Sequence, residues 1–157
     1  MKKSSVEVIA RGVCIKSDMV LLCLTKGADI SYLPGGHTEF NEMARISLER
    51  EIVEELGVES VAGKFLGMIE HNFIQKGRQH CEWNVVFELR IDSLDPENDV
   101  IATEDHISFK WCKVSELKAA KLEPAVLCDL LPQWLSDDSK EERWASAGDF
   151  VTANLTN

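Results

Sequence analysis

The segment Gly36–Val58 reads GHTEFNEMARISLEREIVEELGV. Its chemically specific residues recur at fixed offsets along one short window. Seven positions define the spacing: Gly36, Glu42, Arg50, Glu51, Glu54, Glu55 and Gly57. So many fixed positions make this pattern far more specific than most short motifs.

A helix is predicted over residues 41–56. Asn41 can cap its N-terminus, because an asparagine side-chain oxygen accepts a hydrogen bond from a free backbone N–H. Gly57 can end it in the left-handed conformation that other residues disfavour. An apolar stripe can anchor the helix in a core. The stripe consists of Ala44, Leu48, Ile52 and Leu56.

Three carboxylates, those of Glu51, Glu54 and Glu55, share one face of this helix, since residues three and four apart are neighbours. Alone they would be typical of a solvated acidic face, but Arg50 and the glycines on either side favour a metal site. The three carboxylates repel one another unless a cation lies between them. Carboxylate oxygens suit Mg²⁺, which keeps several waters and takes phosphates as further ligands. The preceding turn, residues 33–36, can bring a backbone carbonyl to the same metal.

The pattern is similar to the signature of the Nudix hydrolase family, and every fixed position of that signature is present. The resemblance implies an α/β fold: a Nudix-type α/β/α sandwich with a mixed β-sheet and a loop–helix–loop catalytic motif. It also implies a hydrolase that cleaves a diphosphate linkage in a nucleoside diphosphate derivative, with Mg²⁺ or Mn²⁺ as cofactor. The expected substrate is a small nucleotide, and we favour a nucleoside triphosphate.

Matching positions imply roles for individual residues. The implied metal ligands are Glu51, Glu54, Glu55 and the Gly35 carbonyl. The implied catalytic set is Arg50, Glu51 and Glu54. Glu51 would bind the metal or activate water, and Arg50 would orient it through a charge-assisted hydrogen bond. The motif geometry would depend on Gly36, Glu42 and Gly57.

Some relatives in this family recruit a further carboxylate, and Glu82 and Glu104 are the two candidates. Arg11 and Lys26 are candidates for binding substrate phosphates. Stacking on a base could come from Tyr32, Phe73 and Trp83. Each of these residues is also typical of an ordinary surface charge or core aromatic, so the sequence leaves both interpretations open.

A length of 157 residues predicts one domain, 1–157, with a helical C-terminal segment from about residue 124. The net charge of −10 disfavours binding of long nucleic acid, which needs a basic surface. No apolar stretch approaches the roughly 20 residues that span a membrane. The five cysteines, an odd number without C-x-x-C, predict buried reduced thiols. We expect a cytoplasmic protein.

Alternating patterns predict the strands, and the first two, Val6–Ile15 and Met19–Lys26, are expected to pair. The others are Ser60–Ile74, with bulges at Gly63 and Gly67, then Glu82–Ile91 and Ile107–Cys112. A helix start is predicted at Val114–Leu117.

The C-terminal part is predicted to be helical. Pro124 suits the first turn of a helix that Pro132 should end or kink. A second cap signal at 137–139 predicts another helix over 140–147. This tail could dock on the domain, form a homodimer contact, or remain solvated and partly frayed.

Three other functions were weighed. A non-catalytic Nudix-like nucleotide sensor would commonly lose signature acids, and this chain keeps them. An isomerase acting on a prenyl diphosphate would need a Cys and a Glu facing each other across a pocket, for which Cys81 and Glu82 are a thin basis. RNA decapping is disfavoured by the net charge.

Overall fold

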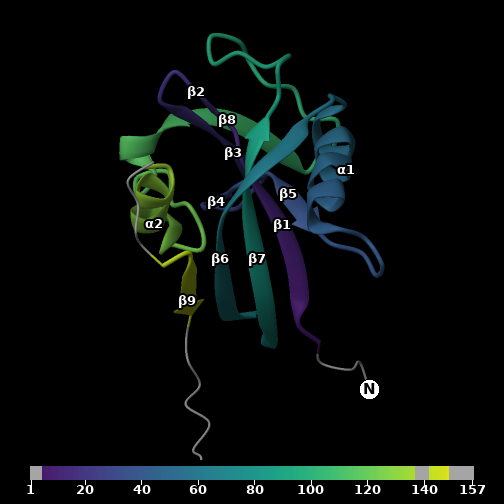
Figure 1. Ribbon diagram of the computed structural model, residues 1–157, viewed down its shortest axis with the longest axis vertical. Helices are drawn as coiled ribbons and strands as arrows, with labels where there is room; N and C mark the ends of the chain where they lie inside the picture. Colours follow the sequence, from purple (N-terminus) through teal and green to yellow (C-terminus); the bar gives the residue numbers. More distant parts are fainter. Residues whose placement is uncertain (1–4, 137–141, 149–157) are drawn as a thin grey trace, which may run out of the picture.

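The larger of two β-sheets forms the centre of the molecule (Figure 1). The computed structural model describes residues 5–136 and 142–148. The sheet order is β5-β1-β7-β6-β9. The strands are β1 Glu7–Val13, β5 Gly35–His37, β6 Val61–Gln75, β7 Arg78–Arg90 and β9 Trp144–Gly148. The sheet is mixed: β1 runs parallel to β7 and β9 parallel to β6, whereas the other neighbours are antiparallel.

The smaller sheet has four strands, with β3 pairing with each of the other three. Its strands are β2 Ile15–Lys16, β3 Met19–Thr25, β4 Ser31–Tyr32 and β8 Ile107–Lys113. The predicted pairing of the first two strands holds only at its hairpin end, where Ile15 pairs with Val20, because β1 and β3 lie in different sheets. Only β2 folds back on β3, through Ser17 and Asp18, whose positive φ values of 50° and 61° suit a tight two-residue hairpin.

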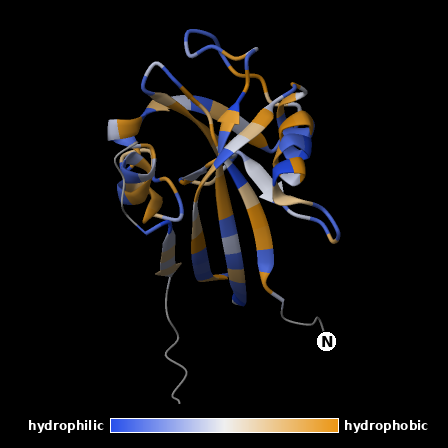
Figure 2. Ribbon diagram, viewed as in Figure 1, coloured by the Kyte–Doolittle hydropathy of each residue, from blue (hydrophilic) through white to orange (hydrophobic). Residues whose placement is uncertain are grey.

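Two helices lie on opposite sides of the strands, α1 Ala44–Leu56 and α2 Leu127–Trp134 (Figure 1). The predicted α/β class with a mixed sheet is thus confirmed. A core under α1 contains Leu48, Ile52 and Leu56, with Ala44 packed against it, as the stripe predicted. The core under α2 contains Leu127, Leu131 and Trp134. Figure 2 shows that hydrophilic residues occupy another part of the α1 surface.

Helix α1 begins later than predicted. Its N-cap is Met43, without a side-chain cap, and Asn41 lies in the loop before it with a φ of 66°. The loop is instead held by Glu42, whose carboxylate accepts the Glu39 N–H at 3.1 Å. The C-terminal prediction is confirmed: Gly57 has a φ of 65° and donates its N–H to the Val53 carbonyl at 2.8 Å.

The chain after β8 is less helical than predicted. A short 3₁₀ turn, η1 Val114–Glu116, replaces the expected helix start, and α2 continues two residues past Pro132. Residues 144–148 form strand β9, so a helix over 140–147 is wrong; the cap signal at 137–139 lies outside the described residues. Pairing with β6 satisfies the β9 backbone groups that face β6, and Ala145 and Ala147 pack against the α2 core.

Both predicted bulges are present in β6, where the register with β7 shifts between Ala62 and Gly67. No helix in the described part of the chain is both long and apolar enough for a membrane span.

Candidate active site

Two glycines before α1 occupy positions where a side chain would not fit. A Cβ on Gly36 would lie 2.5 Å from the Glu51 carboxylate. A Cβ on Gly35 would lie 2.0 Å from the Ala10 carbonyl oxygen, and its φ of +127° also disfavours other residues. These two glycines therefore let the loop backbone lie directly against the carboxylates of α1.

Arg50 joins the acidic residues of α1 to the loop. Its Nε and Nη2 donate to the two carboxylate oxygens of Glu42, at 2.8 and 3.1 Å. Its Nη1 donates to Glu51 Oε1 at 2.9 Å and Glu54 Oε1 at 3.1 Å. A further bond from Nη2 reaches the His37 carbonyl at 3.0 Å. One guanidinium therefore fixes three carboxylates, with a bidentate contact on Glu42.

The electrostatic effect is strong at Glu42. The hydrogen bonds from Arg50 hold the pKa of Glu42 well below its ordinary value, at about 2, with help from the Glu39 N–H. The same carboxylates raise the pKa of Arg50. Both partners therefore stay ionised at any pH near neutrality.

Glu55 is in a very different environment from the other three acids. Its side chain is nearly buried, and its one recorded hydrogen bond is a long one, 3.4 Å from the Gly35 N–H. Burial raises the pKa of Glu55 to about 7, although the nearby Arg11 guanidinium acts in the opposite direction. A buried carboxylate with so little compensation is the kind of group that a bound cation would stabilise.

The donor set fits a hard cation. It comprises three carboxylates on one helix face next to backbone carbonyls of the glycine loop. Within residues 5–136 and 142–148, however, no three His, Cys, Asp or Glu side chains converge as a metal site. Glu51 and Glu54 are turned to Arg50, whereas Glu55 is turned to Gly35.

A cavity of about 590 Å³ adjoins this loop–helix unit. Gly35, Gly36 and Glu55 lie in its wall, so the motif forms one end of the cavity. The remaining wall comes from both sheets and from the segment before α2. Its polar and aromatic residues are Arg11, Thr25, Tyr32, His37, His71, Phe73, Gln75, Glu82, Asn84, His106 and Glu123.

The family model described as the NUDIX domain matches residues 7–131. The chain belongs to the Nudix family. Family membership supports a pyrophosphohydrolase and gives the acidic helix its context, because Nudix hydrolases generally use divalent metals. The resemblance to the Nudix family that the signature indicated is thus confirmed.

Solved Nudix-fold structures resemble the chain over most of its length. A MutT protein from Methanosarcina mazei Go1 is 20% identical with a TM-score of 0.65, covering 85% of this chain and 96% of that one. The E. coli ORF135 protein is 22% identical with a TM-score of 0.59, covering 82% and 88%. A UDP-X diphosphatase is 16% identical with a TM-score of 0.61, covering 92% and 69%. At such identities the likeness shows the Nudix fold. No curated protein sequence matches the chain.

The additional acids predicted for this Nudix chain lie at different places. Glu82 lines the cavity. Glu104 lies outside the lining but pairs with His106, which lines it, at 3.2 Å. The loop that carries Glu104 is tied to α1 through Thr103, whose N–H donates to the Glu55 carbonyl at 2.8 Å and whose hydroxyl donates to the Glu54 carbonyl.

The two basic candidates also differ. Arg11 lines the cavity, where its Nη1 donates to the Leu33 carbonyl at 3.0 Å and the Gly35 carbonyl at 3.1 Å. It therefore supports the glycine loop, a position that the sequence did not indicate. Lys26 is not among the cavity-lining residues.

The three aromatic residues predicted to stack on a base lie at different places. Tyr32 and Phe73 line the cavity, whereas Trp83 does not and instead packs edge-on against Trp144 at 6.2 Å. Sequence reasoning missed His71, Asn84 and Glu123. Asn84 is only 1% exposed, although it is a polar residue in a strand predicted from alternation. A polar residue in an alternating strand can face either solvent or a site, and the pattern does not distinguish the two.

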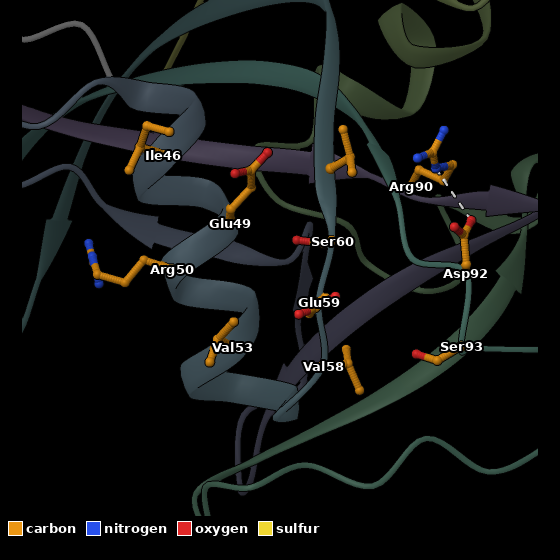
Figure 3. Close-up of a pocket in the computed structure, with 11 residues that line it drawn as sticks. Ile46, Glu49, Arg50, Val53, Val58, Glu59, Ser60, Arg90, Asp92 and Ser93 are labelled. Atoms are coloured by element: carbon orange, nitrogen blue, oxygen red, sulfur yellow. Dashed lines mark ion pairs between the residues drawn. The ribbon is translucent and has the colours of Figure 1, made fainter.

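A second hollow of about 800 Å³ lies between α1 and the segments 58–61 and 90–93 (Figure 3). Figure 3 shows the Arg50 side chain extending away from the Arg90–Asp92 ion pair, which measures 3.4 Å. Glu49, on the side of α1 nearest this pair, accepts the Ala62 N–H at 2.9 Å and so joins α1 to β6. Arg50 also lines this hollow, but the carboxylates that it binds do not.

Proposed function

We propose that this Nudix protein is a Mg²⁺-dependent hydrolase that cleaves a diphosphate linkage in a nucleoside diphosphate derivative, with a nucleoside triphosphate as the favoured substrate. The observation that carries the proposal is the shared position of Glu55, Gly35 and Gly36. These residues belong to the acidic loop–helix unit and also form the end wall of the 590 Å³ cavity. A diphosphate bound in the cavity would therefore lie beside the carboxylates.

The proposed ligands are Glu51, Glu54, Glu55 and the Gly35 carbonyl, with Mn²⁺ as an alternative ion. When bound, the ion would neutralise phosphate charge and lower the pKa of a coordinated water. Glu51 and Glu54 each use one recorded carboxylate oxygen on Arg50, which leaves the other oxygen for a ligand. Glu55 would bind the ion in place of the long hydrogen bond that it accepts from the Gly35 N–H.

Arg50 has the role of a positioning and charge-balancing residue in this proposal. It holds Glu51 next to Gly36, so that a Glu51 oxygen can accept a proton from water at the loop. Its bidentate contact with Glu42 fixes its own orientation. Glu42 therefore acts through Arg50 and not on the substrate.

The cytoplasm is the proposed location. Cys14, Cys23 and Cys112 are buried in the cores, and burial raises the pKa of Cys23 to about 12. Such thiols remain protonated and unreactive, which suits a reducing compartment.

The first test is product identification by mass spectrometry with Mg²⁺. The candidate substrates are nucleoside triphosphates, nucleotide sugars, ADP-ribose and dinucleoside polyphosphates. Cleavage of one class, abolished by a chelator and restored by Mg²⁺ or Mn²⁺, is the expected result. Nucleotide binding without any cleavage would favour the alternative, a non-catalytic Nudix-like sensor.

Two variants test the assigned ligands. Glu54→Gln and Glu55→Gln should each lower turnover by several orders of magnitude and leave the chain folded, because each removes a carboxylate charge without changing its size. Glu88→Gln, the same change on an exposed residue of β7, is the control and should retain full turnover. Normal turnover in both ligand variants would refute the metal site.

A further inference from the structure

The half of the cavity away from the glycine loop is formed on one face of the larger sheet. Glu82 of β7 is in register with His71 of β6. Two residues closer to the start of β7, His80 is in register with Phe73. Arg11 is in register with both Gly35 and Val86, so the loop end of the cavity lies at the Val86 row. At about 3.3 Å per residue, Glu82 lies about 13 Å from that row and His80 about 20 Å. A nucleotide whose phosphates reach α1 would place its base here.

Aromatic rings line this far half. Phe73 stacks on His80, with ring centroids 4.9 Å apart and planes 8° apart. His71 is a second ring neighbour of Phe73, with centroids 4.7 Å apart and planes 31° apart. Because Phe73 and His71 also line the cavity, a planar base bound there would lie against aromatic side chains.

Two carboxylates flank the same space. Burial lowers the pKa of His71, and the charges of Glu82 and Glu123 act on its ring in the opposite direction. The Tyr32 hydroxyl is also affected by both carboxylates. Glu82 and Glu123 come from different parts of the fold, so together they give this end of the cavity hydrogen-bond acceptors from two sides.

Few hydrogen bonds within the protein use these acceptors. Glu82 receives one long bond, 3.4 Å from Asn84 Nδ2. Glu123 accepts the Ala125 N–H with one oxygen, at 3.1 Å. The nearby cation, Arg11, is directed at the Leu33 and Gly35 carbonyls and contacts Asn84 Oδ1 at 3.4 Å. A ligand bound at this end of the cavity therefore meets carboxylate oxygens that can still accept hydrogen bonds.

We propose that His71, Phe73, Glu82 and Glu123 form a nucleobase subsite that selects bases carrying an exocyclic amino group over their oxo or unsubstituted counterparts. The proposal rests on the proposed nucleotide hydrolase function. An amino group of guanine or cytosine donates N–H bonds to a carboxylate. A carbonyl at the same place, as in uracil, points its lone pairs at a negative charge, and hypoxanthine lacks the donor that guanine carries at C2. The rings bind all of these bases by stacking, so the carboxylates supply the discrimination.

The test compares two matched pairs of substrates on the full chain with Mg²⁺. ITP differs from GTP only by the missing amino group, and UTP differs from CTP by an oxo group in place of the amino group. The kcat/KM should be about 10- to 100-fold higher for GTP than for ITP, the range for one hydrogen bond to a charged group. The kcat/KM should likewise be higher for CTP than for UTP. Equal values within either pair would overturn the subsite.

Three variants locate the discrimination. Glu82→Gln should bring the GTP/ITP ratio down towards one, because the carboxylate is replaced by an amide that both donates and accepts. Phe73→Leu should raise KM for GTP and ITP together without changing their ratio. Glu88→Gln is the control on the same strand and should retain the wild-type ratio. A wild-type ratio in Glu82→Gln would also refute the assignment.

Binding measurements separate this proposal from the proposed function. Titration calorimetry with GMP and IMP reports the base subsite even if no nucleotide is hydrolysed. If no nucleotide is hydrolysed, tighter binding of GMP that is lost in Glu82→Gln still supports the subsite. Equal Kd values for GMP and IMP overturn the subsite, and leave the hydrolase function standing if GTP and ITP are both cleaved.

Discussion

Arg50 shows how a single side chain organises this Nudix motif. Its guanidinium binds Glu42, Glu51 and Glu54 together, and it also binds the carbonyl of His37 at the end of β5. A lysine has no planar fork and could not make the bidentate contact to Glu42. The role of Arg50 is therefore geometric as well as electrostatic.

The Glu42–Arg50 contact predicts a pH dependence of stability. The pKa of Glu42 in the folded protein is depressed to about 2, mainly by hydrogen bonds from Arg50. Its contribution to stability is therefore complete above the unfolded pKa, near 4.5, and is lost as the pH falls from there through 2. Glu42→Gln should unfold at a lower urea concentration than wild type at pH 7, and this difference should shrink below pH 4.5.

Urea unfolding at pH 7, 4.5 and 3, with a chelator present to exclude metal effects, measures this difference. The exposed Glu88→Gln variant provides the comparison for loss of one negative charge. A gap between Glu42→Gln and wild type that stayed constant down to pH 3 would contradict the assigned ion pair.

At the scale of elements, the sequence predicted α1 and its end at Gly57 because its periodicity and its C-cap residue are local signals. It also located both bulges of β6, since glycines interrupt that strand. The sequence did not predict which strands pair with β1. Alternation indicates which face of a sheet a side chain occupies, but it does not indicate which strand lies alongside. The sequence also failed to predict β9, a five-residue strand of mostly small side chains that pairs with β6, 76 residues earlier in the chain.

The contact between α2 and β6 predicts a specific sensitivity to substitution. A Cβ on Gly67 would lie 2.4 Å from the Trp134 ring, which is fully buried. Gly67→Ala should therefore lower the free energy of unfolding by about 1–3 kcal/mol, the usual cost of overpacking a core. Chemical denaturation measures this loss.

A double-mutant cycle identifies its cause. Trp134→Leu makes room at the same point, so adding Gly67→Ala to it should cost much less than adding it to wild type. Gly63→Ala, where the nearest side-chain atom is 3.3 Å away, serves as the milder control. Equal costs of Gly67→Ala in both backgrounds would show that the ring is not responsible.

At the scale of the whole molecule, the C-terminal part closes the larger sheet. Strand β9 covers the edge of β6, and Arg143 just before it donates to the Leu66 carbonyl at 2.7 Å and the Trp134 carbonyl at 3.3 Å. The Met68 N–H donates to the Arg143 carbonyl at 2.8 Å. This segment therefore joins α2 to the sheet far from the carboxylates of α1.

Removal of this segment should affect assembly more than chemistry. Truncation after Ser136 exposes the β6 edge, and an uncovered edge strand pairs readily with another copy. We expect lower thermal stability and concentration-dependent self-association by light scattering. A truncated chain that stays monomeric with wild-type stability would show that β9 contributes little to the fold.

Thr103 has a practical consequence for transplanting the motif. Its N–H and hydroxyl occupy the carbonyls of Glu55 and Glu54 at the end of α1, although it follows Gly57 by 46 residues. An engineer who grafted only Gly36–Gly57 onto a new scaffold would leave these two carbonyls without their partner. The smallest portable piece of this motif is therefore discontinuous, and it includes Thr103.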